Sequence, residues 1–463
     1  MKNLTRNLFL TTILTLSLSS VEIIAQLKTQ FKTTTEKKST SVTIYNENLG
    51  IVKEKHSVNL EKGINYVNLI EVATQIDPSS VNVDINANLL EQNYQYDLAS
   101  MQSILQKFID NEIILTGKTE IIGKLISISG NEIVIQTKDG GITMIPNINE
   151  YQLKVNKLPD NLKTKPTLEW KINSDKKSNE EINLTYKTGG MAWNAKYVGV
   201  LNSDETKLNL NSWVDITNNS GASYKDAKLK LVAGNVNLVK DNIYQYDEVM
   251  MMKATMQRDA EQVNFAERTL MDYHIYELDR TSDILNNEKK QIALFNSNDI
   301  KVVKKYNYKA NGNNQNGKAT INVEFVNNKE NGLGIPLPKG VFSIYKEDNN
   351  SNELVGEDRI EHTPKEEKIT LKLGEAFDIT IEDITTNDKR LSDRLYETEY
   401  QVKINNRKES AINIDIKTYF NTNWEVLESN FKYSNPTSSE IIFPIEVKAN
   451  FIQILKYKLR RAF

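Results

Sequence analysis

One histidine stands among charged residues in a pattern that suits acid–base chemistry. His362 follows Asp358 and Glu361 within the segment Gly356–Pro364. Carboxylates beside an imidazole raise its pKa and orient the ring as a general base, which predicts a hydrolase acting through His362. The competing interpretation, which we favour, is a turn residue whose ring bonds a backbone carbonyl beside the Thr-Pro bend that follows.

Charged and aromatic residues provide the candidate binding sites. Asp279 and Arg280 are adjacent and form either a buried ion pair or an exposed binding pair, since arginine offers a planar fork for carboxylates. Trp193, Trp213 and Trp424 are candidate platforms for stacking a carbohydrate. The last two lie in or beside expected strands, which favours a place in a hydrophobic core, whereas Trp193 follows a Gly-Gly loop.

A methionine cluster is the candidate metal site. Met250, Met251, Met252 and Met256 offer thioether sulfur, a soft ligand for Cu(I). The segment shows no copper-type repeat and no histidine before His274, so we favour a flexible connector or a packing helix. We expect no metal and no other cofactor.

Composition narrows the function classes. The 463 residues carry 58 basic and 61 acidic side chains, a net charge of −3, which does not favour nucleic acid as a partner. There is no cysteine, so disulfides, thiolate metal sites and cysteine nucleophiles are excluded. Phosphate-loop, nucleophile-elbow and His-Glu-x-x-His motifs do not occur, and a Ser-His-Asp triad stays open because its members are distant in a chain. An enzyme is the less favoured class.

The N-terminus has the pattern of a signal peptide. Lys2 and Arg6 precede an apolar run over Leu8–Leu18, and Ile23 and Ala25 stand at the −3 and −1 positions of a cleavage site. The alternative is a buried N-terminal helix. Later stretches are too short to form a transmembrane helix. We therefore expect an exported protein, periplasmic or associated with the cell surface, that is not a lipoprotein because it lacks cysteine.

Alternation of apolar and polar residues predicts a mainly β fold. Side chains along a strand point to opposite faces in turn, so alternation marks a strand with one buried face, as in antiparallel sheets. Many such short segments favour several antiparallel β-sandwich domains of immunoglobulin-like type with little helix. The clearest alternating segments are Val42–Tyr45, Ile182–Tyr186, Leu208–Thr217, Ile321–Phe325, Ile369–Leu373 and Ile412–Lys417.

A small separate unit is expected between these segments. Leu98, Met101, Leu105 and Phe108 follow helical spacing. Short strands then follow, joined by Gly-Asn and Asp-Gly dipeptides that form tight hairpins. A short helix before a bent meander of about five strands is similar to an SH3-like or Sm-like barrel, for which we favour a spacer or docking role over RNA binding.

Six phrases of the sequence resemble one known family. In their joint order they are similar to the bacterial domain of unknown function family 4139, related to eukaryotic mucoidy-inhibitor-like proteins. The resemblance covers about residues 168–463, and residues 40–95 look like the β-domain that usually precedes it. Members commonly carry a coiled coil between these parts, where this chain has the helix and barrel. The phrases are Tyr186–Tyr197, Thr217–Gly234, Tyr276–Arg280 with Asn287–Gln291, Gly334–Gly340, His362–Pro364 and Gly374–Asp378.

The resemblance implies a fold and an envelope location, but no activity. The favoured function is a non-catalytic exported protein that binds another envelope protein or a surface polymer, and the alternatives are the hydrolase and a carbohydrate-binding module. We leave the oligomeric state open. The expected parts are a signal peptide (1–25), a flexible lead-in (26–39), an N-terminal β-domain (40–96), the helix and barrel (97–158), a β-sandwich (159–246), a connector (247–270), a β-domain (271–384) and a C-terminal sandwich (385–463).

Overall fold

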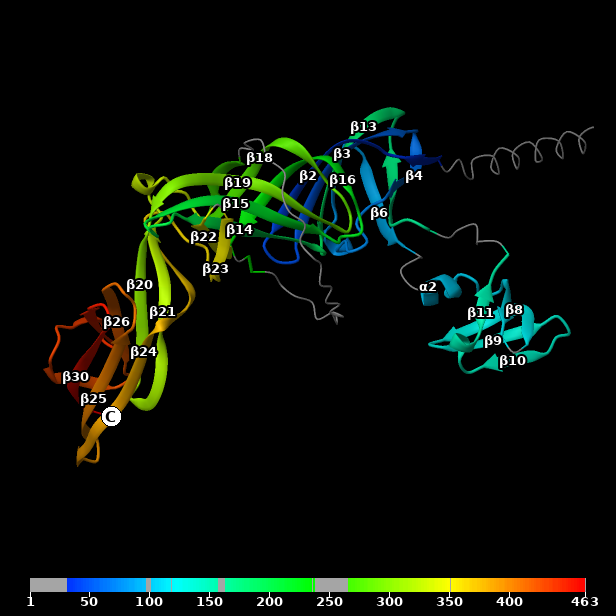
Figure 1. The fold of residues 1–463 in the computed structure, drawn as a ribbon. Helices are drawn as coiled ribbons and strands as arrows, with labels where there is room; N and C mark the ends of the chain where they lie inside the picture. The colour runs from blue at the N-terminus through cyan, green and yellow to red at the C-terminus, as the bar shows by residue number, and fades with distance from the viewer. Residues whose placement is uncertain are drawn as a thin grey trace, which may run out of the picture. The chain divides into compact units, whose positions relative to one another are not determined.

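The computed structural model describes residues 31–96, 101–117, 119–156, 163–234, 236–237, 265–349 and 351–462. These residues form almost only β-strands, as predicted (Figure 1). They belong to two compact units. The first holds the described residues up to Ala192, with Thr217–Lys230 and Arg280–Glu288, and the second holds the remainder. No helix in the described ranges combines the length and apolar character needed to cross a bilayer.

The first unit is built around two sheets with alternating burial. Buried and exposed residues alternate along β13, for example, because one face of the sheet meets the core and the other meets water. Trp170 and Tyr186 are among its largest fully buried side chains. One sheet has the order β1 (Phe31–Thr34), β4 (Gly63–Ile70), β12 (Thr167–Ser174), β6 (Asn88–Gln95). The other, whose strands β2, β3, β13 and β5 and most of β16 lie in this unit, has the order β17 (Phe265–Leu270), β18 (Tyr273–Ile284), β16 (Tyr224–Ala233), β2 (Glu36–Tyr45), β3 (Gly50–Leu60), β13 (Ser178–Thr188), β5 (Asn82–Ile85). A 3-10 turn, η1 (Pro78–Ser80), precedes β5.

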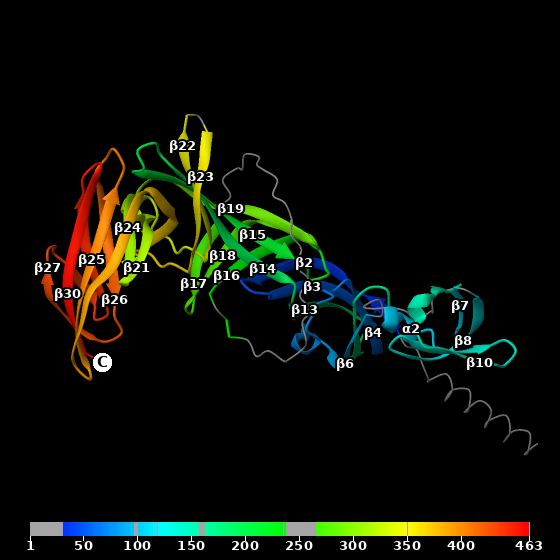
Figure 2. The same ribbon diagram turned by 60° about the horizontal axis from the view of Figure 1, so that its bottom comes forward.

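The small unit expected from the sequence is present (Figure 2). In helix α2 (Met101–Gln106) and the turn after it, Leu105 and Phe108 are buried in the core as their spacing indicates, whereas Met101 is 68% exposed and Leu98 lies outside the described residues. The β8–β9 hairpin turns at Gly130, whose φ is 56°. An antiparallel sheet follows the helix in the order β10 (Ile142–Ile145), β9 (Glu132–Thr137), β8 (Glu120–Ser129), β7 (Glu112–Thr116), β11 (Gln152–Lys154), with η3 (Ile148–Glu150) before β11.

A five-stranded sheet and a hydrophobic core form one part of the second unit. Tyr197 and Phe342 stack in this core at 5.0 Å between ring centroids. Ile369 and Leu371 of a later strand, β24, also pack here. The sheet order is β19 (Glu288–Lys301), β15 (Lys207–Asn218), β14 (Met191–Leu201), β22 (Gly340–Asp348), β23 (Ser351–Ile360).

A nine-stranded sheet forms the other part of the second unit. Strands from both halves of the sheet contribute to one core, in which Tyr400, Tyr457 and Phe443 pack ring against ring. Figures 1 and 2 show β24, β25 and β30 side by side. The sheet order is β27 (Asn423–Ser429), β30 (Phe451–Ala462), β25 (Leu395–Asn406), β24 (Lys368–Ser392), β21 (Asn313–Val326), β20 (Val303–Ala310), β26 (Ile412–Tyr419), β29 (Glu440–Val447), β28 (Ser434–Thr437).

Strands β21 and β24 contribute to both cores of the second unit. Val323 and Phe325 of β21 pack in the first core and Ala319 in the second. Likewise, the Ile369 end of β24 packs in the first core and Ile379 in the second. The two cores are therefore connected by continuous hydrogen-bonded strands. The short η4 turn (Lys329–Asn331) follows β21.

Several details differ from the sequence predictions. The lead-in is not wholly flexible, since residues 31–34 and 36–39 lie in β1 and β2, and residues 265–270 of the connector form β17. The boundary at 384/385 falls inside β24, and β12 pairs with β4 and β6 across the expected boundary at 159. The strand pairs β1–β4, β14–β22 and β20–β26 are parallel. Pairing between distant strands leaves no local signal, so the alternation predicted the strands but not their partners. Residues 1–25 lie outside the described residues.

Candidate functional site

The structure places His362 at a junction of loops. The Nδ1 atom of the half-buried ring accepts a hydrogen bond from the Lys339 N–H at 3.2 Å, and Nε2 is buried without a partner in the described part of the chain. The expected bond to a carbonyl is therefore wrong. Burial lowers the pKa of His362, and the charge of Lys339 lowers it further. The charge of Glu361 acts in the opposite direction but does not outweigh them. Asp358 accepts a hydrogen bond from the Lys372 N–H at 2.7 Å instead, and among the described residues no carboxylate or nucleophile is hydrogen-bonded to the His362 ring.

Two buried tyrosines hold the segment opposite His362. The hydroxyl of Tyr197 donates to the Pro338 carbonyl at 2.7 Å, and that of Tyr276 donates to the Pro336 carbonyl at 2.9 Å. Burial raises the pKa of both hydroxyls, so both remain protonated donors. Three phrases that carry the family resemblance thus meet here, and what they share is the satisfaction of buried backbone carbonyls.

The tryptophans do not form a common platform. Trp193 is fully buried, and its Nε1 donates to the Val232 carbonyl at 3.0 Å. Trp424 packs against the core of the nine-stranded sheet and donates to the Ser438 carbonyl at 2.7 Å. Trp213 is partly buried. The core interpretation therefore applies to Trp193 as well, where the sequence left the question open.

The remaining sequence candidates do not assemble a site. Asp279 and Arg280 are both exposed, and Arg280 donates a hydrogen bond to the Thr281 carbonyl instead of pairing with Asp279. The four clustered methionines lie outside the described residues. Within the described residues, no group of three or more histidine and acidic side chains could hold a metal ion.

A buried polar cluster in the first unit includes a histidine that the sequence analysis did not single out. Glu54 bonds His56 Nε2 at 3.0 Å and Lys37 Nζ at 2.6 Å, and the side chains of Glu54 and His56 are 3% and 1% exposed. Burial works to raise the pKa of Glu54, but the His56 hydrogen bond and the Lys37 charge outweigh it and lower the pKa. Burial also raises the pKa of Tyr224, to about 12. Because solvent does not reach the pair, we assign it a structural role.

Glycine turns interlock at one end of the first unit. The Gly190 N–H donates to Asn48 at 2.7 Å, and the Asn219 N–H donates back to the Gly190 carbonyl at 2.7 Å. Gly221 has a φ of 86°, and a Cβ added there would lie 1.8 Å from the Thr74 hydroxyl oxygen. Gly190, Asn219 and Gly221 belong to the phrases of the family resemblance, and the close packing explains why glycine is needed at positions 190 and 221.

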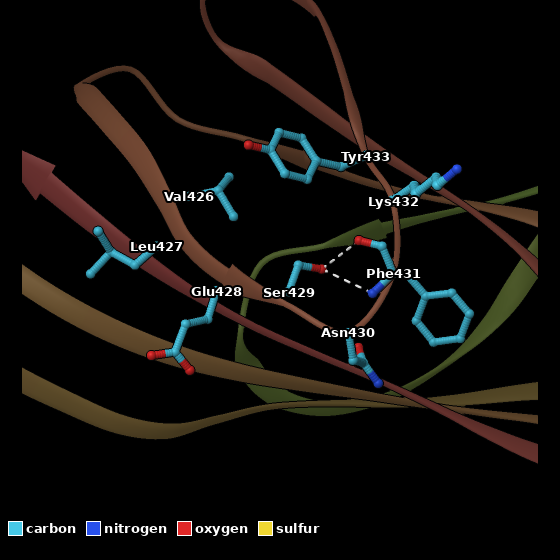
Figure 3. Close-up of a pocket in the computed structure, with 8 residues that line it drawn as sticks. All are labelled: Val426, Leu427, Glu428, Ser429, Asn430, Phe431, Lys432 and Tyr433. Carbon is cyan, nitrogen blue, oxygen red and sulfur yellow. Dashed lines mark hydrogen bonds between the residues drawn. The ribbon is translucent and has the colours of Figure 1, made fainter.

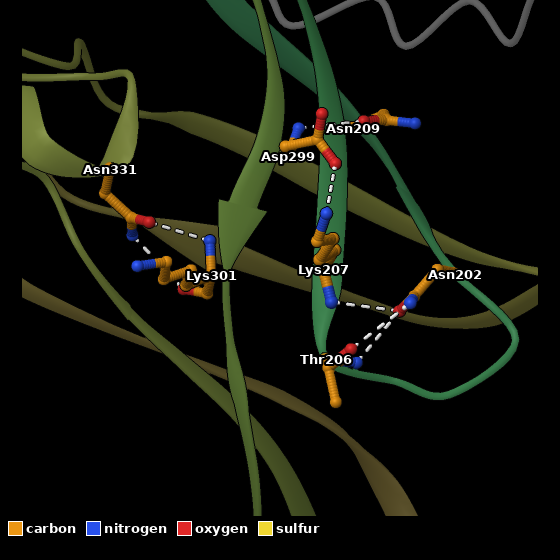
Figure 4. Close-up of polar contacts among 7 residues, drawn as sticks. All are labelled: Asn202, Thr206, Lys207, Asn209, Asp299, Lys301 and Asn331. Carbon is orange, nitrogen blue, oxygen red and sulfur yellow. Dashed lines mark hydrogen bonds and ion pairs between the residues drawn. The ribbon is translucent and has the colours of Figure 1, made fainter.

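Amide side chains stabilise an irregular edge of β19 (Figure 4). Asp299 has a φ of 57°, and its N–H donates to the Asn209 side chain at 3.0 Å. Asn331 likewise accepts from the Lys301 N–H at 2.7 Å. These polar groups satisfy the backbone, and Lys207 pairs with Asp299 at 2.8 Å, so the cluster is structural.

One hollow is formed by the end of β27 and the loop that follows it (Figure 3). It measures about 590 Å³ and is lined only by the consecutive residues 426–433. Ser429 and Phe431 bond each other within it, and Asn430 bonds the backbone of β30. Ser429 and Asn430 are thus already used in holding the segment to itself and to β30.

A groove on the nine-stranded sheet is the candidate binding site. It has a volume of about 620 Å³ and crosses β21, β24 and β25. Its shape comes from a large bulge in β24, where residues 376–379 stand opposite the single residue Ala319 of β21. Bulges redirect side chains and occur often next to functional sites. The residues that line the groove are Asn316, Gly317, Lys318, Glu375, Thr380, Ile381, Glu382, Lys403 and Asn405.

The bulge carries an exposed aromatic ring beside the groove. Phe377 is 81% exposed, and Lys318 Nζ lies 4.9 Å from its ring centroid. The neighbours Ala376 and Ile379 are buried and anchor the bulge in the core. A single exposed hydrophobic side chain is ordinary on a protein surface, so Phe377 indicates a contact surface only together with the polar side chains of the groove beside it.

The floor of the groove is a regular polar array. Strand register places Lys318, Thr380 and Asn405 in one row across three strands. Directly opposite residues point to the same face of a sheet, so these side chains are neighbours. A second row consists of Asn316, Glu382 and Lys403.

The two lysines of the groove differ in their partners. Lys403 pairs with Glu382 at 3.3 Å, whereas Lys318 and Glu375 take part in no ion pair within the described residues. The phrase Gly374–Asp378 is part of the family resemblance, but no site was predicted there. The available signal was Glu375, which stands where the alternation of Ile369–Leu373 would place an inward apolar residue.

No protein-family model matches the chain, and no curated protein is significantly similar to it. The function therefore has to be argued from the geometry of these residues.

Proposed function

We propose that this chain is an exported, non-catalytic β-protein that binds a polymer of the cell surface through the groove on β21, β24 and β25. The observation that carries the proposal is the exposed ring of Phe377, held on a buried anchor beside two rows of polar side chains. The signal-peptide pattern of residues 1–25 and the resemblance to a bacterial family of unknown activity support an envelope location.

Rigid placement makes this surface suitable for recognition. All three strands of the groove are hydrogen-bonded within the sheet, so the backbone positions that carry the side chains are fixed before a ligand arrives. Preorganised groups lose less conformational entropy on binding than groups on a mobile loop. An extended polymer also needs an open surface, and this groove lies on the solvent-facing side of the sheet.

Co-sedimentation tests the proposal. Insoluble envelope material from the cells that produce the protein is mixed with purified wild type, Phe377→Ala or Phe451→Ala. Phe451 is a matched control because it is also exposed, at 49%, on the same sheet, but it does not line the groove. We expect wild type and Phe451→Ala to sediment with the material and Phe377→Ala to remain in solution. Equal sedimentation of all three would contradict the proposal.

A further inference from the structure

The groove combines features that together define a ligand class. Resting on the proposed function, we infer that the polymer is an uncharged glycan with neighbouring hydroxyl groups, whose apolar C–H face packs on Phe377. Charge, hydrogen-bonding capacity, backbone pairing and size each support this inference.

Charge comes first. Two lysines, Lys318 and Lys403, and two glutamates, Glu375 and Glu382, line the groove, so its formal charge is 2 − 2 = 0. A polyanion would meet both carboxylates and a polycation would meet both ammonium groups. Neither gains net Coulomb attraction from such a surface, whereas a neutral ligand has no charge to be repelled.

The groove offers both hydrogen-bond donors and hydrogen-bond acceptors. The side chains of Asn316, Thr380 and Asn405 both donate and accept, while the glutamates accept and the lysines donate. Donors and acceptors therefore lie side by side on the floor of the groove. A sugar hydroxyl is itself both a donor and an acceptor, and two neighbouring hydroxyls match an adjacent donor and acceptor.

The aromatic ring adds the apolar contact. One side of a sugar ring presents mainly C–H groups, which pack on the face of an aromatic ring. Phe377 offers such a face because most of its surface is exposed. Lys318 rests against the same ring, where its charge is attracted by the π-system. The ring and the polar rows thus meet the two sides of an amphipathic ligand.

Backbone pairing argues against an extended peptide here. Over Thr380–Asp383, the part of β24 that forms the floor of the groove, the strand is bonded to β21 on one side and to β25 on the other, whereas the bulge residues 376–378 lie outside both registers. The N–H and C=O groups of the floor are therefore not available to a peptide, and strand addition needs a free sheet edge. Recognition at this site must come from side chains, as for a glycan.

The array also has a suitable size. Register continues each row onto β30, where Ile452 stands opposite Asn405 and is 46% exposed. Neighbouring strands lie about 4.8 Å apart, so a row from β21 to β30 spans about 14 Å. This surface can contact several successive units of a chain and not merely one small molecule.

Chemical treatment of the envelope material tests the ligand class. Mild periodate cleaves the carbon–carbon bond between neighbouring hydroxyl carbons, whereas proteinase K removes protein. We expect periodate to abolish sedimentation of the wild type, proteinase K to leave it unchanged, and a rise from about 50 to about 500 mM NaCl to weaken binding less than about twofold.

Variants complete the test. Phe377→Ala is expected to weaken binding about tenfold, the loss of a central aromatic contact, with Phe451→Ala unchanged. Phe377-dependent binding that survives periodate, that is lost with proteinase K, or that falls steeply with salt overturns the glycan and leaves the proposed function in place. Binding to untreated material that does not depend on Phe377 overturns the proposed function itself.

Discussion

Two regions of this chain combine carboxylates, basic groups and aromatic rings on neighbouring strands, and solvent exposure separates their roles. In the first unit, Glu54 and His56 are almost completely buried and bonded to each other. In the groove of the second unit, Glu375 and Lys318 face water with no ion-pair partner in the described residues. The same residue types therefore stabilise the fold in one place and remain available to a ligand in the other.

The difference teaches where function should be sought in an all-β chain. A buried charge must be paired because its desolvation is costly, so its hydrogen-bonding groups are already occupied within the protein. An exposed charge costs little to leave unpaired, and so it can be kept for recognition. The exposed aromatic residue, Phe377, is what distinguishes the groove from an ordinary solvated face.

Breaking the buried pair should have the largest effect. Glu54→Ala leaves His56 buried without its partner and should lower the free energy of unfolding by about 4 kcal/mol. The double variant Glu54→Leu with His56→Leu removes both polar groups and should recover most of that loss. Urea unfolding followed by circular dichroism measures both. A double variant as unstable as the single one would show that the pair is not the unit of stability.

A glycine comparison should give the next largest effect. Gly221 and Gly140 share a φ of 86°, but an added Cβ meets Thr74 at the first and nothing within 4 Å at the second. Gly221→Ala should cost about 3 kcal/mol through strain and overlap, and Gly140→Ala about 1 kcal/mol through strain alone. Hydrogen exchange in the domain that carries each glycine measures the two losses. Equal losses of stability in the two variants would show that backbone strain at positive φ, and not overlap with Thr74, causes the whole loss.

The pH dependence of stability should show a smaller effect at His362. Burial and the Lys339 charge lower the pKa of the folded histidine, so the unfolded chain takes up a proton first as pH falls. The contribution of His362 to the free energy of unfolding is therefore fully present above about pH 6.5 and declines as the pH falls below that value. His362→Asn keeps an acceptor for the Lys339 N–H and should reduce the fall in Tm between about pH 7.5 and about pH 5.5. An unchanged fall would exclude His362 as its source.

The exposed ion pair should have the smallest effect on stability. Lys403 and Glu382 have side chains 41% and 48% exposed, so water screens the pair. Lys403→Met should change the free energy of unfolding by less than about 0.5 kcal/mol. A loss comparable to that of Glu54→Ala would erase the contrast between the two regions.

Much of the fold was predictable because alternation reports which face of a strand is buried. Ile412, Ile414 and Ile416 alternate with polar residues, and all three are buried in β26. Partners were not predictable in the same way. Ile414 lies beside Tyr306 in a parallel pair, and nothing near either residue indicates the other.

The candidate site was harder to predict because it depends on a break in the alternation. Phe377 and Glu375 were visible in a quoted phrase, but their exposure follows from a bulge that pairing with β21 defines. The histidine chosen from the sequence, His362, has charged neighbours along the chain but not in hydrogen-bond contact. His56 was passed over because its partners Glu54 and Lys37 are brought together by strand pairing.

The strands shared by the two cores of the second unit have a mechanical consequence. Because β21 and β24 run through both cores, a pull between them is carried by rows of backbone hydrogen bonds acting in parallel, with no slack linker to extend first. The bulge that holds Phe377 lies on these shared strands, so tension along them would act on the same few residues that carry the proposed ligand contact.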